Sequence, residues 1–190
     1  MRIGIIDSGM GGLAITKQIQ NPLDQYIVLL DCAFFPYGTK TKEFLYKRSF
    51  YLVNFLIQQK VDMIILACNT LSIVALNFLK QCFKIKILGV FDFFIPFLKS
   101  ENAIIGSKHT IKYVKDNYPI LCIDGTALIE AIEKKLDYNL CIQNIDFPKS
   151  KLLLLACTHF LSIDKELFPI PTLNQIKYLK EEIKKARNSS

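Results

Sequence analysis

Short apolar runs alternate with amphipathic stretches through most of the chain, and this alternation restricts the folds that it can adopt. The apolar runs in the first half, which we expect to be strands, are Arg2–Asp7, Tyr26–Asp31, Met63–Ala67 and Lys86–Val90. The stretches between them have helical spacing and lie at about Leu13–Gln20, Lys42–Gln59 and Leu71–Phe83. Strands that are apolar along their whole length are typical of parallel sheets with helices on both faces. The sequence therefore predicts an α/β fold.

The second half repeats this alternation on a smaller scale. We expect strands at Ala103–Gly106, Ile120–Ile123 and Lys151–Cys157, and helices at Thr110–Asn117, Thr126–Leu136 and Asn174–Lys185. Thr126 is a candidate N-cap. The Phe-rich segment Phe91–Leu98, which contains Pro96, is the best candidate for the crossing between the halves. It is too apolar for a flexible linker, so the two halves should pack on each other.

These elements predict two pseudo-symmetric, small parallel-sheet α/β domains that face each other across a cleft. The first would comprise residues 1–95 together with residues 168–190, whose helix returns to it, and the second, trimmed domain would comprise residues 96–167. A chain of 190 residues, 51% of them hydrophobic, is long enough to bury such cores and is unlike a disordered chain.

Composition and charge exclude several other classes of protein. No apolar run reaches the ~20 residues of a membrane span, and no signal-peptide core precedes Asp7, so we expect a soluble, cytoplasmic protein. The formal charge of +7 allows a nucleic-acid partner, but the lysines are scattered, which favours solvated faces instead. The six cysteines contain no C-x-x-C pair and, with only His109 and His159 beside them, form no zinc-finger pattern.

Two matched segments, one in each half, end in a cysteine. Met63–Leu66 leads into Ala67-Cys68-Asn69-Thr70, and Leu152–Leu155 leads into Ala156-Cys157-Thr158-His159. Ligands of open parallel sheets bind outside the carboxyl ends of the strands, so each cysteine lies where a ligand is expected. The alternative is that two strands end in buried cysteines by chance. Because the segments match, we favour two functional thiols that flank one cleft.

Two thiols on opposite sides of a cleft suit the inversion of a carbon that carries one acidic hydrogen. One thiolate removes the proton from one face, and the opposite thiol delivers a proton to the other face. A free thiol has a pKa of ~8.5, so a modest lowering supplies thiolate at neutral pH. This chemistry needs no metal and no cofactor.

The segment Asp7-Ser8-Gly9-Met10-Gly11-Gly12 joins the first expected strand to the first expected helix. Backbone N–H groups at such a turn can hold a carboxylate or a phosphate. The glycine spacing matches neither a dinucleotide-binding fingerprint nor a P-loop, which disfavours a nucleotide. Asp7 could accept a proton or orient a thiol, and capping of the following helix is an almost equal alternative. The turn at Pro36–Thr39 lies on the same carboxyl edge.

Four segments, in this order, resemble the motifs of the glutamate racemases, within the wider aspartate/glutamate racemase superfamily. They are Asp7–Leu13 (D-S-G-M-G-G-L), Pro36–Gly38 (P-Y-G), Ala67–Thr70 (A-C-N-T) and Cys157–His159 (C-T-H). Each is weak alone, but four in the right order are specific. A weaker likeness runs through Ile105–Ile111 and through the expected helix that carries Glu130 and Glu133.

The resemblance implies a cofactor-independent isomerase that interconverts L- and D-glutamate and supplies D-glutamate for peptidoglycan biosynthesis, cell wall biogenesis and cell shape. It implies that Cys68, assisted by Asp7, acts on the α-proton of the D-enantiomer, and that Cys157, assisted by His159, acts on that of the L-enantiomer. The residues that would hold the substrate are Asp7, Ser8, Tyr37, Gly38, Asn69, Thr70, Thr158 and His159. The family also places an acidic residue near the second cysteine, and both Glu130 and Glu133 fit this place.

Several alternatives stay open on the sequence. Aspartate is the alternative substrate, because the depth of the pocket sets the length of the carboxylate chain and the sequence does not show that depth. A catalytically weakened anion-binding protein on the same fold is a second alternative. A thiol redox protein is a third, although the lack of a C-x-x-C pair argues against it. A homodimer is the alternative to a monomer.

Overall fold

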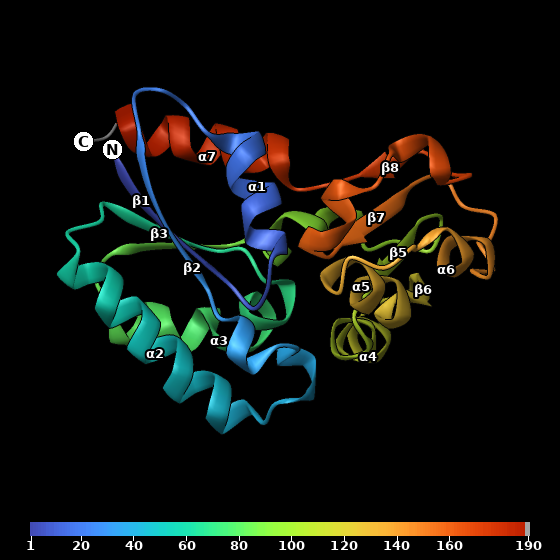
Figure 1. The fold of residues 1–190 in the computed structure, drawn as a ribbon, viewed down its shortest axis with the longest axis horizontal. Helices are drawn as coiled ribbons and strands as arrows, with labels where there is room; N and C mark the ends of the chain where they lie inside the picture. Colours follow the sequence, from blue (N-terminus) through green and yellow to red (C-terminus); the bar gives the residue numbers. More distant parts are fainter. Residues whose placement is uncertain (189–190) are drawn as a thin grey trace.

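Two lobes lie side by side, each built on one four-stranded sheet (Figure 1). The structure, a computed structural model, describes residues 1–188, so residues 189 and 190 of the predicted first domain lie outside the described residues. The first sheet contains β1 (Arg2–Asp7), β2 (Gln25–Leu30), β3 (Met63–Leu66) and β4 (Lys86–Gly89) in the order β2-β1-β3-β4. The second contains β5 (Ala103–Gly106), β6 (Leu121–Asp124), β7 (Leu153–Ala156) and β8 (Thr172–Leu173) in the order β6-β5-β7-β8. Every pairing between these strands is parallel, which confirms the predicted α/β fold with two parallel sheets.

Helices and short 3₁₀ segments connect the strands. The α-helices are α1 (Gly11–Ile19), α2 (Lys42–Gln58), α3 (Asn69–Cys82), α4 (Lys108–Asn117), α5 (Thr126–Glu133), α6 (Asn139–Gln143) and α7 (Ile176–Asn188). The 3₁₀ segments are η1 (Cys32–Phe34), η2 (Tyr37–Thr39), η3 (Val90–Phe97), η4 (Thr158–Ser162) and η5 (Lys165–Leu167). Among residues 1–188, no helix combines the length and the apolar character that crossing a membrane requires.

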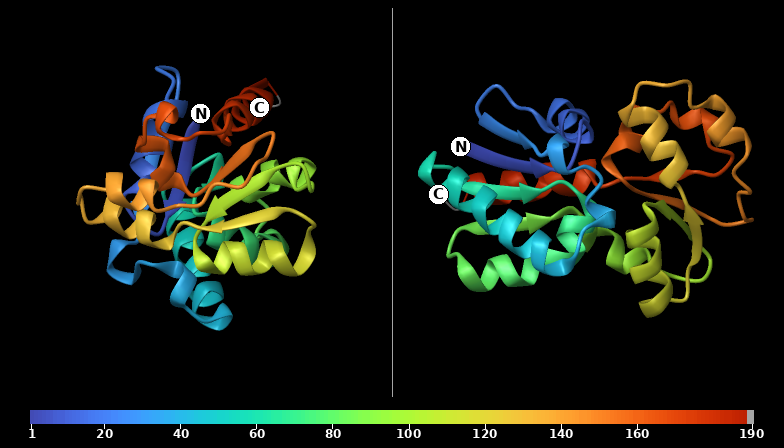
Figure 2. Two further views of the ribbon diagram at one scale, coloured as in Figure 1. Left: turned by 90° about the vertical axis from the view of Figure 1, so that its right-hand side faces the viewer. Right: turned by 60° about the horizontal axis from the view of Figure 1, so that its bottom comes forward.

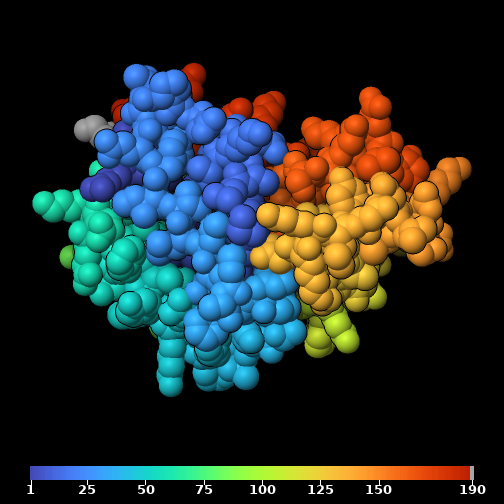
Figure 3. All heavy atoms as spheres, viewed as in Figure 1, coloured from blue at the N-terminus to red at the C-terminus, as the bar shows by residue number. Residues whose placement is uncertain are grey.

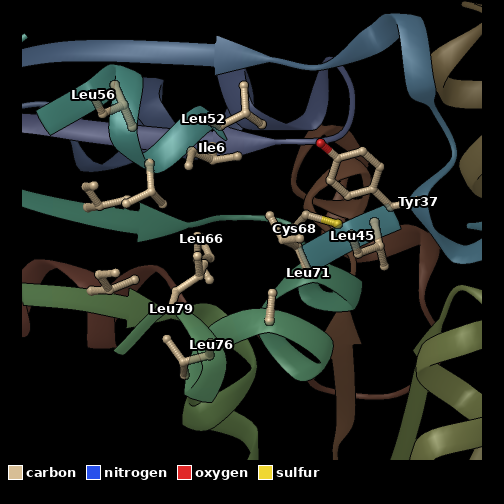
Figure 4. Packing of buried hydrophobic residues seen from close by; sticks show 14 of the residues in the cluster. Ile6, Tyr37, Leu45, Leu52, Leu56, Leu66, Cys68, Leu71, Leu76 and Leu79 are labelled. Atoms are coloured by element: carbon tan, nitrogen blue, oxygen red, sulfur yellow. The ribbon is translucent and has the colours of Figure 1, made fainter. Parts of the chain in front are cut away.

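The central strands of the first sheet contribute to a core on each face. Ile3 and Ile5 of β1 pack with α1 and α7, whereas Ile6 packs with α2 and α3 (Figure 4). Successive side chains of a strand point to opposite faces, so a strand covered on both sides must be apolar at every position. This is why the strands are continuous apolar runs in the sequence.

Helix α7 returns to the first lobe after the chain has completed the second sheet. Its apolar residues Ile176, Leu179 and Ile183 join the core that contains Ile3 and Ile5. Figures 1 and 2 show α7, in red, beside the first sheet in every view. Its amphipathic pattern provides the apolar stripe that this face of the sheet requires.

We propose a domain division close to the predicted one, with the return crossing placed later in the chain. Phe168 and Ile170 pack in the core of the second lobe, and β8 pairs with β7. The chain therefore leaves the second lobe after Leu173 and not before residue 168. The first crossing is η3 with the residue that follows it, Leu98, and Phe91, Phe94 and Leu98 are buried there against residues of the second lobe.

Some local predictions were wrong. Thr126 is not an N-cap, because Gly125 occupies that position and the Thr126 hydroxyl instead donates to Asp124 Oδ1 at 2.6 Å. Helix α5 ends at Glu133 rather than at Leu136, and Lys135 has a positive φ of 55° that is incompatible with a continuing helix. The short elements α6 and β8 were not predicted, because five and two residues show no usable periodicity.

Candidate active site

The carboxyl ends of strands from both sheets meet at one cavity between the lobes. Asp7 ends β1, Cys68 follows β3, and Cys157 directly follows β7, and all three residues line this cavity. Every residue that the resemblance implied for substrate binding also lines it, namely Asp7, Ser8, Tyr37, Gly38, Asn69, Thr70, Thr158 and His159. The cavity has a volume of about 40 Å³, which is room for a few water molecules but not for an amino acid. The structure is therefore closed, and the lobes or the lining side chains must move to admit a substrate.

Asp7 is a buried carboxylate at the boundary between the lobes. Its Oδ1 accepts a hydrogen bond of 2.7 Å from the Ser8 backbone N–H, and its Oδ2 accepts one of 2.9 Å from the Thr158 hydroxyl of the second lobe. Burial raises the pKa of Asp7 to about 6, against the lowering effects of His159 and of these hydrogen bonds. Asp7 does not cap α1, because Met10 is the N-cap residue there.

Cys68 is a buried thiol immediately before α3, and 8% of its surface is exposed. Burial, together with the negative charge of Asp7, raises the pKa of Cys68 to about 12, although a hydrogen bond with Ser8 acts in the opposite direction. The sulfur of Cys68 is therefore protonated at neutral pH, which is the form that can donate a proton.

Cys157 lies at one end of a chain of polar contacts within the second lobe. Its Sγ is 3.3 Å from Nδ1 of His159, and Nε2 of His159 is 2.5 Å from Oε2 of Glu133. Burial acts to lower the pKa of His159, but Cys157, Glu133 and Asp7 outweigh it and raise that pKa to about 10. His159 is therefore the group that contacts the Cys157 sulfur, and Glu133 is the group that orients His159.

The two acidic candidates on α5 have different surroundings. The side chain of Glu133 is 12% exposed and contacts His159, whereas that of Glu130 is 45% exposed and pairs with Lys134 at 3.7 Å. Of these two alternatives, the structure brings Glu133 to His159, whereas the partner of Glu130 is a lysine on the same helix.

Hydrogen bonds across the lobe boundary hold the cavity closed. Besides the bond from Thr158 to Asp7, the Met10 backbone N–H donates to Glu133 Oε2 at 3.0 Å, and the hydroxyls of Thr70 and Ser107 lie 3.2 Å apart. In Figure 3, atoms of the first lobe meet those of the second directly along this boundary.

Curated proteins similar to this chain place it in a family. The glutamate racemase of Buchnera aphidicola subsp. Schizaphis graminum (strain Sg) is 36% identical over 189 residues, which cover 86% of this chain and 74% of that protein. The chain belongs to the glutamate racemase family. No protein-family model matches it.

Solved structures of glutamate racemases agree with this membership. The enzyme from Campylobacter jejuni subsp. jejuni is 26% identical with a TM-score of 0.79, over 97% of this chain and 85% of that one. The enzyme from Thermus thermophilus, in complex with beta-chloro-D-alanine, is 25% identical with a TM-score of 0.83, over 99% of this chain and 80% of that one. The prediction of an amino-acid racemase, an isomerase, is confirmed.

The cavity is also lined by residues that were not among the predicted site residues. They are Phe35, Pro36, Ser107, Thr110, Ile129 and Ala156. Ser107 and Thr110 fall within the segment of weaker likeness, which was a usable signal, whereas Ile129 looks like an ordinary core residue in the sequence. Within residues 1–188, no group of three or more His, Cys, Asp and Glu side chains is arranged to hold a metal ion.

Proposed function

We propose that this protein interconverts L- and D-glutamate by proton transfer to and from Cys68 and Cys157. The observation that carries this proposal is that the two cysteines, one from each sheet, line the same small cavity. Burial keeps Cys68 a thiol, and Cys157 faces the imidazole of His159. The names of the relatives and the D-alanine derivative bound to the Thermus thermophilus enzyme support an amino-acid substrate.

In the L-to-D direction, the Cys157 sulfur removes the α-proton. The Cα–H bond breaks, an S–H bond forms, and the electron pair stays on the substrate as a carbanion. The Cys68 thiol then delivers its proton to the opposite face, so its S–H bond breaks and a new Cα–H bond forms. His159 compensates the charge of Cys157 before the transfer, and Asp7 assists Cys68. In the D-to-L direction the two cysteines exchange roles.

Asn69 provides further support for a polar ligand in the cavity. It is the first residue of α3 and is 4% exposed, yet neither its amide nitrogen nor its amide oxygen has a hydrogen-bond partner among the described residues. A buried amide without a partner is costly, so a substrate that bonds to it would bind favourably. The N–H groups at the start of α3 also favour an anionic group, such as a substrate carboxylate.

The test is racemisation, followed by circular dichroism, of both glutamates by the wild type and by Cys68→Ser and Cys157→Ser. Both variants should fold and lose racemisation, whereas Cys82→Ser, which replaces an exposed cysteine away from the cavity, should keep the wild-type rate. A rate close to that of the wild type in either active-site variant would refute the two-cysteine mechanism.

Two further arms of this test separate the alternatives. Racemisation of aspartate in preference to glutamate would replace the proposed substrate. Glutamate that binds in D₂O without gaining deuterium at Cα would indicate an anion-binding protein without activity. Activity on glutamate would support the proposed biological role, which is the supply of D-glutamate for peptidoglycan in the cytoplasm.

A further inference from the structure

One wall of the cavity is a single segment, residues 32–39, which we call the wall loop. Phe35, Pro36, Tyr37 and Gly38 of this loop line the cavity. The loop lies between the lobes, because Phe35 packs in the core of the second lobe with its ring centroid 5.7 Å from that of His159. Tyr37 instead belongs to the first-lobe core and lies beside Cys68 (Figure 4). The position of the wall loop therefore determines the space beside both reacting sulfurs.

Asp31, directly after β2, connects the wall loop to helix α2. The Tyr37 hydroxyl donates to Asp31 Oδ2 at 2.5 Å. Arg48 of α2 donates to the same carboxylate twice, from Nε to Oδ2 at 2.8 Å and from a terminal nitrogen to Oδ1 at 2.5 Å. The side chain of Asp31 is 5% exposed and that of Arg48 is 28% exposed. This is a two-point arginine–carboxylate pair, which fixes orientation as well as distance.

Arg48 is itself held by aromatic rings. Its guanidinium carbon lies 4.8 Å from the ring centroid of Phe34, within the wall loop, and 5.5 Å from that of Tyr51. Arg48 therefore contacts the loop directly through Phe34 and indirectly through Asp31 and Tyr37. The Tyr37 hydroxyl is occupied by Asp31, and burial together with this hydrogen bond raises its pKa. Tyr37 thus shapes the cavity and is not a proton donor to the substrate.

We propose that Arg48 is a positioning residue: acting through Asp31 and Tyr37, it holds the wall loop in the conformation that binds substrate between the two cysteines. Arg48 does not line the cavity and touches no reacting atom. The inference takes the identity of the substrate from the proposed function, but the position of the wall loop can be tested separately.

The kinetic test is Arg48→Met, which keeps the length of the side chain and removes the charge and both hydrogen bonds. If the wall loop spends less time in the conformation that binds substrate, the apparent affinity for substrate falls in proportion to the population of that conformation. The chemistry of the bound state does not change. We expect KM for both glutamates to rise at least tenfold, with kcat within about threefold of the wild type. Arg48→Lys keeps the charge without the two-point geometry, so its KM should lie between those of the wild type and Arg48→Met.

Arg187→Met is the matched control. Arg187 pairs at 2.5 Å with Asp24, whose side chain is 0% exposed, so this substitution also deprives a buried carboxylate of its arginine. Neither residue lines the active-site cavity. Arg187→Met should lose stability and keep the wild-type KM. An Arg48→Met protein whose KM is also unchanged would overturn the proposal and leave Arg48 with a merely structural role.

A second readout does not depend on racemisation. Displacement of the wall loop should expose Cys68, so a thiol-reactive probe should label it at least tenfold faster in Arg48→Met than in the wild type or in Arg187→Met. If the wild type does not racemise glutamate but Cys68 is still labelled faster in Arg48→Met, the proposed function is contradicted and the positioning role of Arg48 is retained. If Arg48→Met leaves both the labelling of Cys68 and KM unchanged, only the positioning role of Arg48 is contradicted. If Arg48→Met does not fold, Tyr37→Phe replaces it in the test, because this variant removes only the hydroxyl. Its KM should rise, by less than the rise expected for Arg48→Met. An unchanged KM in Tyr37→Phe would refute the proposal.

Discussion

Replacement of Asp7 by asparagine should stabilise the protein at neutral pH while it removes activity. Asp7 is 1% exposed, and among the described residues its carboxylate accepts hydrogen bonds only from the Ser8 backbone N–H and the Thr158 hydroxyl. An asparagine can keep both contacts, because its Oδ1 accepts from Ser8 N–H and the Thr158 hydroxyl can accept from its Nδ2. The substitution therefore removes the buried charge with little other change.

The magnitude follows from the pKa of Asp7, which is raised from 3.8 to about 6 in the folded state. Each pKa unit corresponds to ~1.4 kcal/mol, so the ionised carboxylate lowers the stability of the fold by about 3 kcal/mol above pH 6. Between these two pKa values the folded state binds more protons than the unfolded state, so wild-type stability falls as pH rises. Below pH ~4 Asp7 is neutral in both states and the penalty is absent.

The assay is urea unfolding of the wild type and Asp7→Asn between pH 4 and pH 8. The difference in unfolding free energy should be near zero at the acid end and should grow to about 3 kcal/mol in favour of the variant at neutral pH. Asp24→Asn is the control, because Arg187 and the N-terminus overcome the effect of burial and lower the pKa of Asp24. The change in unfolding free energy for this variant should therefore have the opposite sign to that for Asp7→Asn. A difference between Asp7→Asn and wild type that does not vary with pH would refute the reasoning.

The remaining predictions concern activity, closure and a helix cap. If Asp7 must be ionised and His159 protonated, kcat/KM should rise through about pH 6 and fall through about pH 10, and a profile that is flat through pH 6 would contradict the role of Asp7. In Gly11→Ala, the added Cβ would overlap Thr158 Oγ1 and lie 3.0 Å from the His159 backbone nitrogen, which pushes the lobes apart. A misplacement of about 1 Å can cost ~100-fold, so kcat/KM should fall by that order, and an unchanged value would show that closure tolerates the shift. Thr41→Ala removes the hydroxyl that accepts from Phe44 N–H at the start of α2, and should lower the unfolding free energy in urea by about 1 kcal/mol with unchanged kcat/KM.

The sequence by itself predicted strands β1 to β7 of the two sheets, and its motifs indicated most residues of the cavity. A strand buried on both faces must be apolar at each position, so β1, β3 and β7 are visible as continuous runs without any knowledge of their neighbours. The carboxyl ends of parallel strands share one edge of a sheet, which is why Asp7, Cys68 and Cys157 could be placed at a ligand site from chain order alone.

Tertiary structure decided the partners of those residues. Glu130 and Glu133 are both acidic residues of α5, and only the packing of α5 against η4 brings the Glu133 carboxylate to His159 and leaves Glu130 in solvent. The pairing of Arg48 with Asp31 and Tyr37 likewise joins a helix, a strand end and a loop. Such contacts depend on distances of a few ångströms between segments that are independent in the sequence, and periodicity reports only which face of an element is apolar. The perturbed pKa values of Asp7, Cys68 and His159 have the same origin, because burial and neighbouring charge exist only once the lobes have closed.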